Sequence, residues 1–95
     1  MQYIALIHKN ADTPPTSAEW EHFIEVAVKT GLFKGGSEIG SGQTIGNKPV
    51  ADTSQTVGGY MRFDSEILEP LLKLLDQHPV VKHGGTIELL TMPKS

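Results

Sequence analysis

Three short stretches of the chain have the apolar, β-branched and aromatic composition of β-strands, and a fourth, at residues 34–39, is only a short β-like piece. In chain order, the four are residues 2–8, 34–39, 57–63 and 85–91. Glycines interrupt the second stretch and the long segment after it, so an irregular strand and a loop are expected there. The pair Gly58-Gly59 in the third stretch indicates a bulge or a close backbone approach. After the last strand, a short tail at residues 92–95 is expected to fray.

A first helix is predicted between the first two strands. Thr16 and Glu19 have the spacing of a capping box, and Gly31 suits a left-handed C-cap, which gives a helix of about 14 residues. At about 100° per residue, the apolar side chains fill one broad arc and the charged ones the other. Trp20 lies on the apolar arc and His22 on the polar arc. The helix is therefore expected to cover a core with one side.

A second helix is predicted between the last two strands. Asp64 or Ser65 can cap it, but Pro70 fits only the first turn of a helix, so the regular part should begin near Leu68. Its leucines share one arc opposite the charged side chains, so this helix also covers a core. Pro79 should end it, and a loop should follow.

The order strand, helix, strand, strand, helix, strand is typical of the ferredoxin-like βαββαβ fold, an α+β fold whose two helices cover one face of an antiparallel sheet. The length of 95 residues is that of one domain, so residues 1–95 are predicted to form a single domain. A core of this size is modest, and a second subunit would usefully enlarge it.

The first strand is apolar on both of its faces. Alternation places Tyr3, Ala5 and Ile7 on one face and Ile4 and Leu6 on the other. No remaining segment is long or apolar enough to cover the second face. We therefore expect a homodimer in which two sheets pack face to face about a two-fold axis.

Three segments resemble the YCII-related family of small proteins, in the branch named after a DGPF tetrapeptide. They are residues 1–7, the run Ala-Asp-Thr-Ser-Gln-Thr-Val-Gly-Gly-Tyr at residues 51–60, and residues 78–88 with the ending Gly-Gly-Thr-Ile-Glu. The resemblance implies a dimeric α+β barrel, in which ferredoxin-like subunits pair through their sheets. Where the family has its tetrapeptide, residues 47–50 read Asn-Lys-Pro-Val and keep only the proline. The position of the histidine in the family's proposed site is closest to Trp20, with His22 two residues later.

Composition and charge exclude several classes of function. Eight Lys and Arg against 11 Asp and Glu give a net charge of −3, and no basic cluster lies beside aromatic residues, so a nucleic-acid partner is not expected. The chain has no cysteine, which excludes disulfides, thiolate metal sites and cysteine nucleophiles. The N-terminal apolar run is too short for a signal peptide or a membrane span. We expect a protein of the cytoplasm without membrane contact.

The four histidines, at positions 8, 22, 78 and 83, do not have the spacing of a metal site, and none is predicted. His22 should be solvated. His78 falls on the apolar arc in the last turn of the second helix and is interpreted as a structural cap. The glycine pattern matches no phosphate-binding loop, so no nucleotide or other cofactor is expected.

Polar residues on the second face of the sheet form the candidate site. If the apolar members of the last two strands face the helices, alternation sends Tyr60, Arg62 and Glu88 the other way, and His8 joins them. Buried charges need partners, so Arg62 and Glu88 should pair with each other, with the second subunit or with a ligand. One interpretation is an ion pair across the dimer. The other is a small-molecule pocket in which Tyr60 and Arg62 bind the ligand and His8 or Glu88 moves a proton.

Two functions therefore remain open. Relatives on the implied fold include lyases, isomerases and dehydrochlorinases that act through a few acid-base side chains without an organic cofactor. The resemblance thus implies an acid-base enzyme acting on a small organic molecule. The alternative is a non-catalytic homodimeric module that binds a small ligand or a partner. The sequence does not decide between them.

Overall fold

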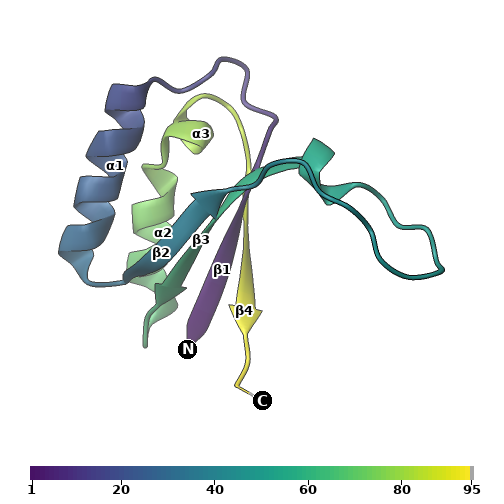
Figure 1. The fold of residues 1–95 in the computed structure, drawn as a ribbon. Helices are drawn as coiled ribbons and strands as arrows, with labels where there is room; N and C mark the ends of the chain where they lie inside the picture. The colour runs from purple at the N-terminus through teal and green to yellow at the C-terminus, as the bar shows by residue number, and fades with distance from the viewer. Residues whose placement is uncertain (95) are drawn as a thin grey trace.

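The computed structural model describes residues 1–94 and contains one four-stranded antiparallel sheet. The sheet has the spatial order β2-β3-β1-β4, and its strands are β1 (Gln2–His8), β2 (Phe33–Glu38), β3 (Val57–Asp64) and β4 (Ile87–Met92). Two helices, α1 (Ser17–Thr30) and α2 (Leu68–Asp76), lie on one side of it (Figure 1). The ferredoxin-like topology predicted from the element order is confirmed. The predicted C-terminal tail includes Ser95, which lies outside the described residues.

The ends of α1 are those the sequence predicts. The Thr16 hydroxyl oxygen accepts a hydrogen bond from the Glu19 N–H at 3.2 Å, and the Glu19 carboxylate accepts one from the Thr16 N–H at 3.0 Å. Both halves of the capping box are thus formed. Gly31 ends the helix in the left-handed conformation, with φ of 75°. These local signals thus determine both ends of α1.

The second helical segment differs from the prediction in two ways. Helix α2 begins at Leu68 as expected, but its N-cap is Ile67, and neither Asp64 nor Ser65 caps it. Pro79 does not simply end the helix, because it begins a further short helix, α3 (Pro79–Lys82). Proline suits the first position of a helix, where its missing N–H would have no partner in any case. His78 is therefore the N-cap of α3 and not part of the last turn of α2.

The register of the sheet separates two faces as the alternation predicts. Ala5 lies opposite Met61 and Leu89, and these residues face the helices. Ile4 lies opposite Arg62 on the other side of the sheet, which we call the free face because no described element covers it. The helix-covered face and the helices bury Ala5, Ile7, Phe23, Ala27, Met61, Phe63, Leu71, Leu74, Leu75 and Val80.

The glycine pair in β3 forms the predicted bulge. Ile7 pairs with Gly59 and His8 pairs with Val57, so Gly58 is the extra residue on its strand.

Between β2 and β3 the chain forms a long segment. Residues 40–53 are all exposed, and the segment extends well away from the sheet (Figure 1). Among the described helices, none has the length and apolar character needed to cross a membrane.

Candidate functional site

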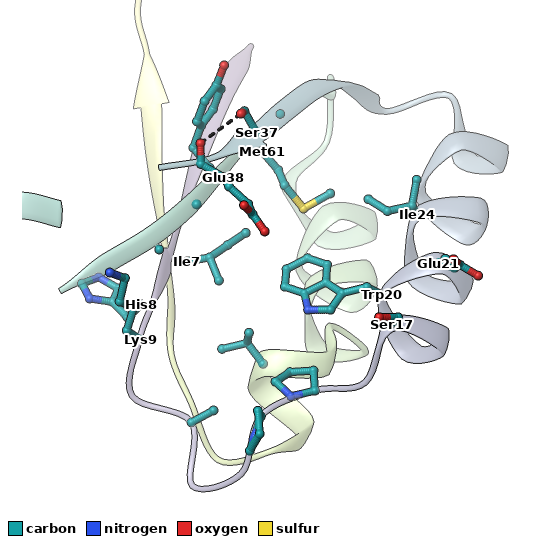
Figure 2. A pocket seen from close by; sticks show the side chains of 18 of the residues that line it. Ile7, His8, Lys9, Ser17, Trp20, Glu21, Ile24, Ser37, Glu38 and Met61 are labelled. Atoms are coloured by element: carbon teal, nitrogen blue, oxygen red, sulfur yellow. Dashed lines mark hydrogen bonds between the residues drawn. The ribbon is translucent and has the colours of Figure 1, made fainter. Parts of the chain in front are cut away.

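A cavity of about 760 Å³ lies between the N-terminal half of α1 and the sheet (Figure 2). Its volume falls in the range of about 300–1,000 Å³ that is typical of small-molecule sites. The loop between β1 and α1 closes one end. The apolar side chains that line it are Ile7, Ala11, Pro14, Pro15, Trp20, Ile24, Phe33, Met61 and Val80. Most of the wall therefore suits an apolar ligand.

Two helix-facing positions of the sheet that line the cavity, Gly36 and Gly59, carry no side chain. Gly36 pairs with Met61 on the helix-covered face, and Gly59 lies between Glu38 and Ile7. A Cβ atom at Gly59 would come within 3.2 Å of the Ser37 carbonyl oxygen. Gly36 has a further constraint, because a Cβ atom there would clash with the Tyr60 carbonyl oxygen. The floor of the cavity is thus a stretch of bare backbone.

One carboxylate, that of Glu38, borders this apolar space and is itself exposed to solvent. The Glu38 side chain extends from the end of β2 toward the space between Ile7 and Trp20, whereas Glu21 points away from it (Figure 2). The Lys9 ammonium donates to the Ser54 carbonyl at 2.7 Å, which holds it beside η1 (Thr53–Gln55). Glu38 is therefore the acidic group best placed to exchange a proton with a bound molecule.

A fully buried histidine lies behind the cavity wall. His78 is 0% exposed, and its Nδ1 accepts a hydrogen bond from the Val80 N–H at 3.1 Å. Its ring packs edge-on against Trp20 at 4.6 Å between centroids and against Phe23 at 4.5 Å. Burial lowers the pKa of His78 from 6.5 to about 4, so the ring is neutral near pH 7. The sequence suggested a cap in the last turn of the second helix; the structure instead makes His78 the N-cap of α3.

His83 fastens the loop that closes the cavity. Its Nε2 lies 2.8 Å from the Glu19 carboxylate and its Nδ1 lies 2.6 Å from the Thr13 hydroxyl. The pKa of Glu19 is lowered first by the hydrogen bond from the Thr16 backbone and then by His83. Because the carboxylate can only accept, the imidazole donates to it from Nε2. The first turn of α1 and the loop before it are thereby joined.

The four residues of the predicted site lie on the free face or at its rim. His8 Nε2 is 3.1 Å from the Glu88 carboxylate, and Tyr60 and Glu88 flank Leu6 in one row of the sheet. Arg62 donates to the Lys34 carbonyl oxygen at 3.0 Å. Within residues 1–94, Arg62 and Glu88 form no ion pair with each other.

His8 and Tyr60 also border the cavity, but the His8 ring points away from its centre (Figure 2). Arg62 and Glu88 are both exposed on the free face. The structure therefore brings His8 and Glu88 together and leaves Arg62 at the far side of β3. The cavity opens on the opposite side of the sheet from this group.

His22 is exposed, as its place on the polar arc predicts. In the part of the chain that the structure describes, no three His, Asp or Glu side chains are grouped so that they could hold a metal ion.

Sequence reasoning did not identify Glu38 or the cavity. The available signal was the helix-facing position of Gly36 and Gly59, but the register that defines this position becomes visible only once β2 is paired. The network of Thr13, Glu19 and His83 was also missed, because it joins residues 70 positions apart. Trp20 was assigned correctly to the apolar side of α1.

No family model and no curated protein matches the chain. Among solved structures, it is similar to 5-chloro-2-hydroxyhydroquinone dehydrochlorinase from Burkholderia phenoliruptrix AC1100, in complex with 2,5-dihydroxybenzoquinone. The match covers 100% of this chain and 96% of that chain, with 12% sequence identity and a TM-score of 0.48. With a TM-score below 0.5, this likeness carries no argument about the fold or the reaction of this chain.

Proposed function

We propose that the protein binds a small, largely apolar organic molecule in the cavity under α1 and acts on it by acid-base chemistry, with Glu38 transferring the proton. The observation that carries this proposal is the cavity itself, which combines an apolar wall with one inward-pointing carboxylate. A carboxylate held beside apolar walls suits proton transfer to or from a bound carbon acid. No step requires an organic cofactor.

The resemblance to the YCII-related family supports the same type of chemistry. At the position closest to the family's site histidine, this chain has Trp20, which forms part of the cavity wall. An indole provides a flat apolar surface but cannot take up a proton. The acid-base role would therefore pass to Glu38, and Trp20 would contact the face of a flat ligand.

Binding is tested with a pair of probes of nearly equal shape, 4-ethylphenol and 4-hydroxyacetophenone. Trp20 is the single tryptophan of the chain, so its fluorescence reports ligand contact at the cavity wall. Both probes should change this fluorescence in a saturable way. The Ile24→Phe variant, which narrows the cavity, should weaken binding, whereas Val28→Phe on an exposed part of α1 should not. Equal binding by both variants would place the ligand elsewhere.

Catalysis is tested by exchange of the methyl protons of 4-hydroxyacetophenone in D2O, followed by NMR. The wild-type protein should accelerate the exchange, and Glu38→Gln should abolish the acceleration. Glu66→Gln, at an exposed position outside the cavity lining, is the matched control. Saturable binding without accelerated exchange would favour the non-catalytic binding module.

A second role is favoured by the free face. Ile4 and Leu6 lie at its centre with Leu90, which is 41% exposed, and an apolar sheet face of this kind suits contact with another copy of the chain. We propose a homodimer through this face. The predicted roles of His8 and Glu88 in moving a proton, and of Tyr60 and Arg62 in binding a ligand, stay predictions for the same surface.

Sedimentation at micromolar concentration tests the dimer, with a mass near 20 kDa expected. Arg62→Ala separates the two readings of the free face. Dissociation of the dimer in this variant would support an interface role for Arg62, and an intact dimer would favour the ligand role over the interface role. A monomer at all concentrations would contradict the homodimer.

A further inference from the structure

The ring of His78 has one nitrogen whose partner is known and one that lacks a partner. Nδ1 accepts the Val80 N–H at 3.1 Å, so this nitrogen carries no proton. A neutral imidazole then has its proton on Nε2. That Nε2 is buried and finds no hydrogen-bond partner among the described residues. The protein thus holds an oriented, buried N–H donor without a hydrogen-bond acceptor among the described residues.

Such a group is costly in a folded protein. A buried donor without an acceptor typically destabilises the fold by about 1–3 kcal/mol, and unsatisfied groups of this kind are rare. Packing alone does not require a histidine here, since the ring is surrounded by Trp20 and Phe23 and an apolar side chain would fill the same space. The N-cap does not require it either, because Asn or Asp would accept from the same N–H.

The unpartnered nitrogen belongs to a residue that adjoins the cavity wall. Trp20 contacts His78 with ring centroids 4.6 Å apart and also lines the cavity. Val80 donates its backbone N–H to His78 and lines the cavity with its side chain. One layer of wall therefore separates His78 from the space where a ligand would lie. Trp20, which forms this layer, is half-buried.

We infer that the Nε2–H of His78 donates a hydrogen bond to a carbonyl or enolate oxygen of the molecule bound in the cavity, once the Trp20 indole turns aside. The inference rests on the proposed function and specifies the ligand as a carbonyl compound. A neutral imidazole whose other nitrogen is held by a backbone N–H can polarise a carbonyl group by donating a hydrogen bond, without giving up its proton. Glu38 would remove a proton, and His78 would stabilise the negative charge that develops on oxygen.

The first test uses wild-type protein with 15N-labelled histidine. In the free protein, the NMR spectrum should show His78 with its proton on Nε2 from pH 7.5 down to pH 5. Addition of 4-hydroxyacetophenone should move the Nε2 proton resonance downfield, because the proton gains an oxygen acceptor. 4-Ethylphenol has no carbonyl and should leave it nearly unmoved. An Nε2 resonance that responds equally to both probes, or to neither while both bind, would overturn the inference.

The second test compares affinities. One hydrogen bond of ordinary strength predicts that wild-type protein prefers 4-hydroxyacetophenone to 4-ethylphenol by about tenfold. His78→Asn keeps an acceptor for the Val80 N–H and removes the Nε2 donor. The variant should therefore bind the two probes with about equal affinity. His22→Asn, on the exposed side of α1, is the matched control and should keep the preference. A preference that survives in His78→Asn would contradict the inference.

The two proposals fail in different ways. If both probes bind with equal affinity and the cavity-narrowing Ile24→Phe weakens both, the cavity stands as the binding site and the role of His78 falls. If neither probe binds to the wild-type protein, both proposals fall. The NMR measurement does not depend on whether His78→Asn folds.

Discussion

The two faces of the sheet have similar apolar residues but differ in what covers them. On the helix-covered face, Phe63 is 1% exposed and Met61 is 3% exposed, while on the free face Ile4 and Leu6 are only half-buried. The covered face contains a cavity at the positions where glycine replaces a side chain. The free face has its polar groups in contact with water, as in the pair of His8 and Glu88.

This difference shows why the energetic effect of a polar residue depends on which face of the sheet it occupies. A charged pair in water gains little from its partner, because solvent screens it and ordering the side chains opposes it. A neutral imidazole enclosed by aromatic rings, such as His78, has its pKa lowered and its unused donor preserved. The groups with altered chemistry therefore lie on the covered side, although the free face has more charges.

The largest expected effect distinguishes the two faces directly. Phe63→Ala should lower the free energy of unfolding by about 3–5 kcal/mol, because it leaves a cavity in the buried core. Ile4→Ala on the free face should lower it by only about 1 kcal/mol in dilute solution. Urea unfolding measures both. If the cost of Ile4→Ala grows with protein concentration, a second copy covers the free face; equal losses for both variants in dilute solution would contradict the comparison.

The next effect is a loss of stability in acid that originates in His78. The unfolded chain takes up a proton near pH 6.5, whereas the folded ring does so only near pH 4, so the unfolded state binds more protons between these values. Stability is therefore full above pH 6.5 and falls as the pH drops. The loss should be about 2 kcal/mol by pH 5 and about 3 kcal/mol by pH 4.

Urea unfolding at pH 7.5 and pH 5 measures this loss. Above pH 5, the change in stability reports His78 and not Glu19. The pKa of Glu19 is lowered, so the stability that its carboxylate contributes is lost only at more acidic pH. His78→Asn should flatten the dependence, and His22→Asn should retain it. An NMR titration of His78 with an ordinary pKa would refute this account.

A smaller effect tests the glycine floor of the cavity. Gly36→Ala should lower the free energy of unfolding by about 1–3 kcal/mol, because the added methyl group meets the Tyr60 carbonyl and β2 must shift. Gly42→Ala, in the long segment between β2 and β3, is the control, since a Cβ there meets nothing within 4 Å. Thermal unfolding compares the two. If both variants are equally stable, the close approach of β2 to β3 is not required.

The smallest effect is expected from the polar pair on the free face. His8→Gln removes the 3.1 Å contact with Glu88 and should change the free energy of unfolding by less than about 1 kcal/mol. It should also leave probe binding in the cavity unchanged. A marked loss of exchange activity in this variant would instead support the proton-moving role predicted for His8 and Glu88.

The sequence predicted those parts of the fold that depend on local patterns. The capping box at Thr16, the C-cap at Gly31 and the bulge at Gly58 follow from nearest neighbours along the chain, and all three are confirmed. The end of α2 was predicted less well, because Pro79 can either end one helix or begin another, and the choice depends on tertiary packing of His78.

The candidate site was harder to predict because it depends on pairing between strands. Alternation correctly placed Tyr60, Arg62 and Glu88 on the free face, but no local signal indicated that Glu38 would lie beside Gly59 over a cavity. The bond between His83 and Glu19 joins distant parts of the chain, so its geometry could not be read from either neighbourhood. Long-range proximity was the missing information in each case.

The exposed segment at residues 40–53 leaves the sheet from β2 and returns to its neighbour β3, and these two strands stay hydrogen-bonded to each other. A peptide tag or fluorescent label inserted within residues 40–53 would lie on this excursion, which extends away from the sheet (Figure 1). The molecule thus provides its own attachment point for surface immobilisation, at a distance from the hydrophobic interior.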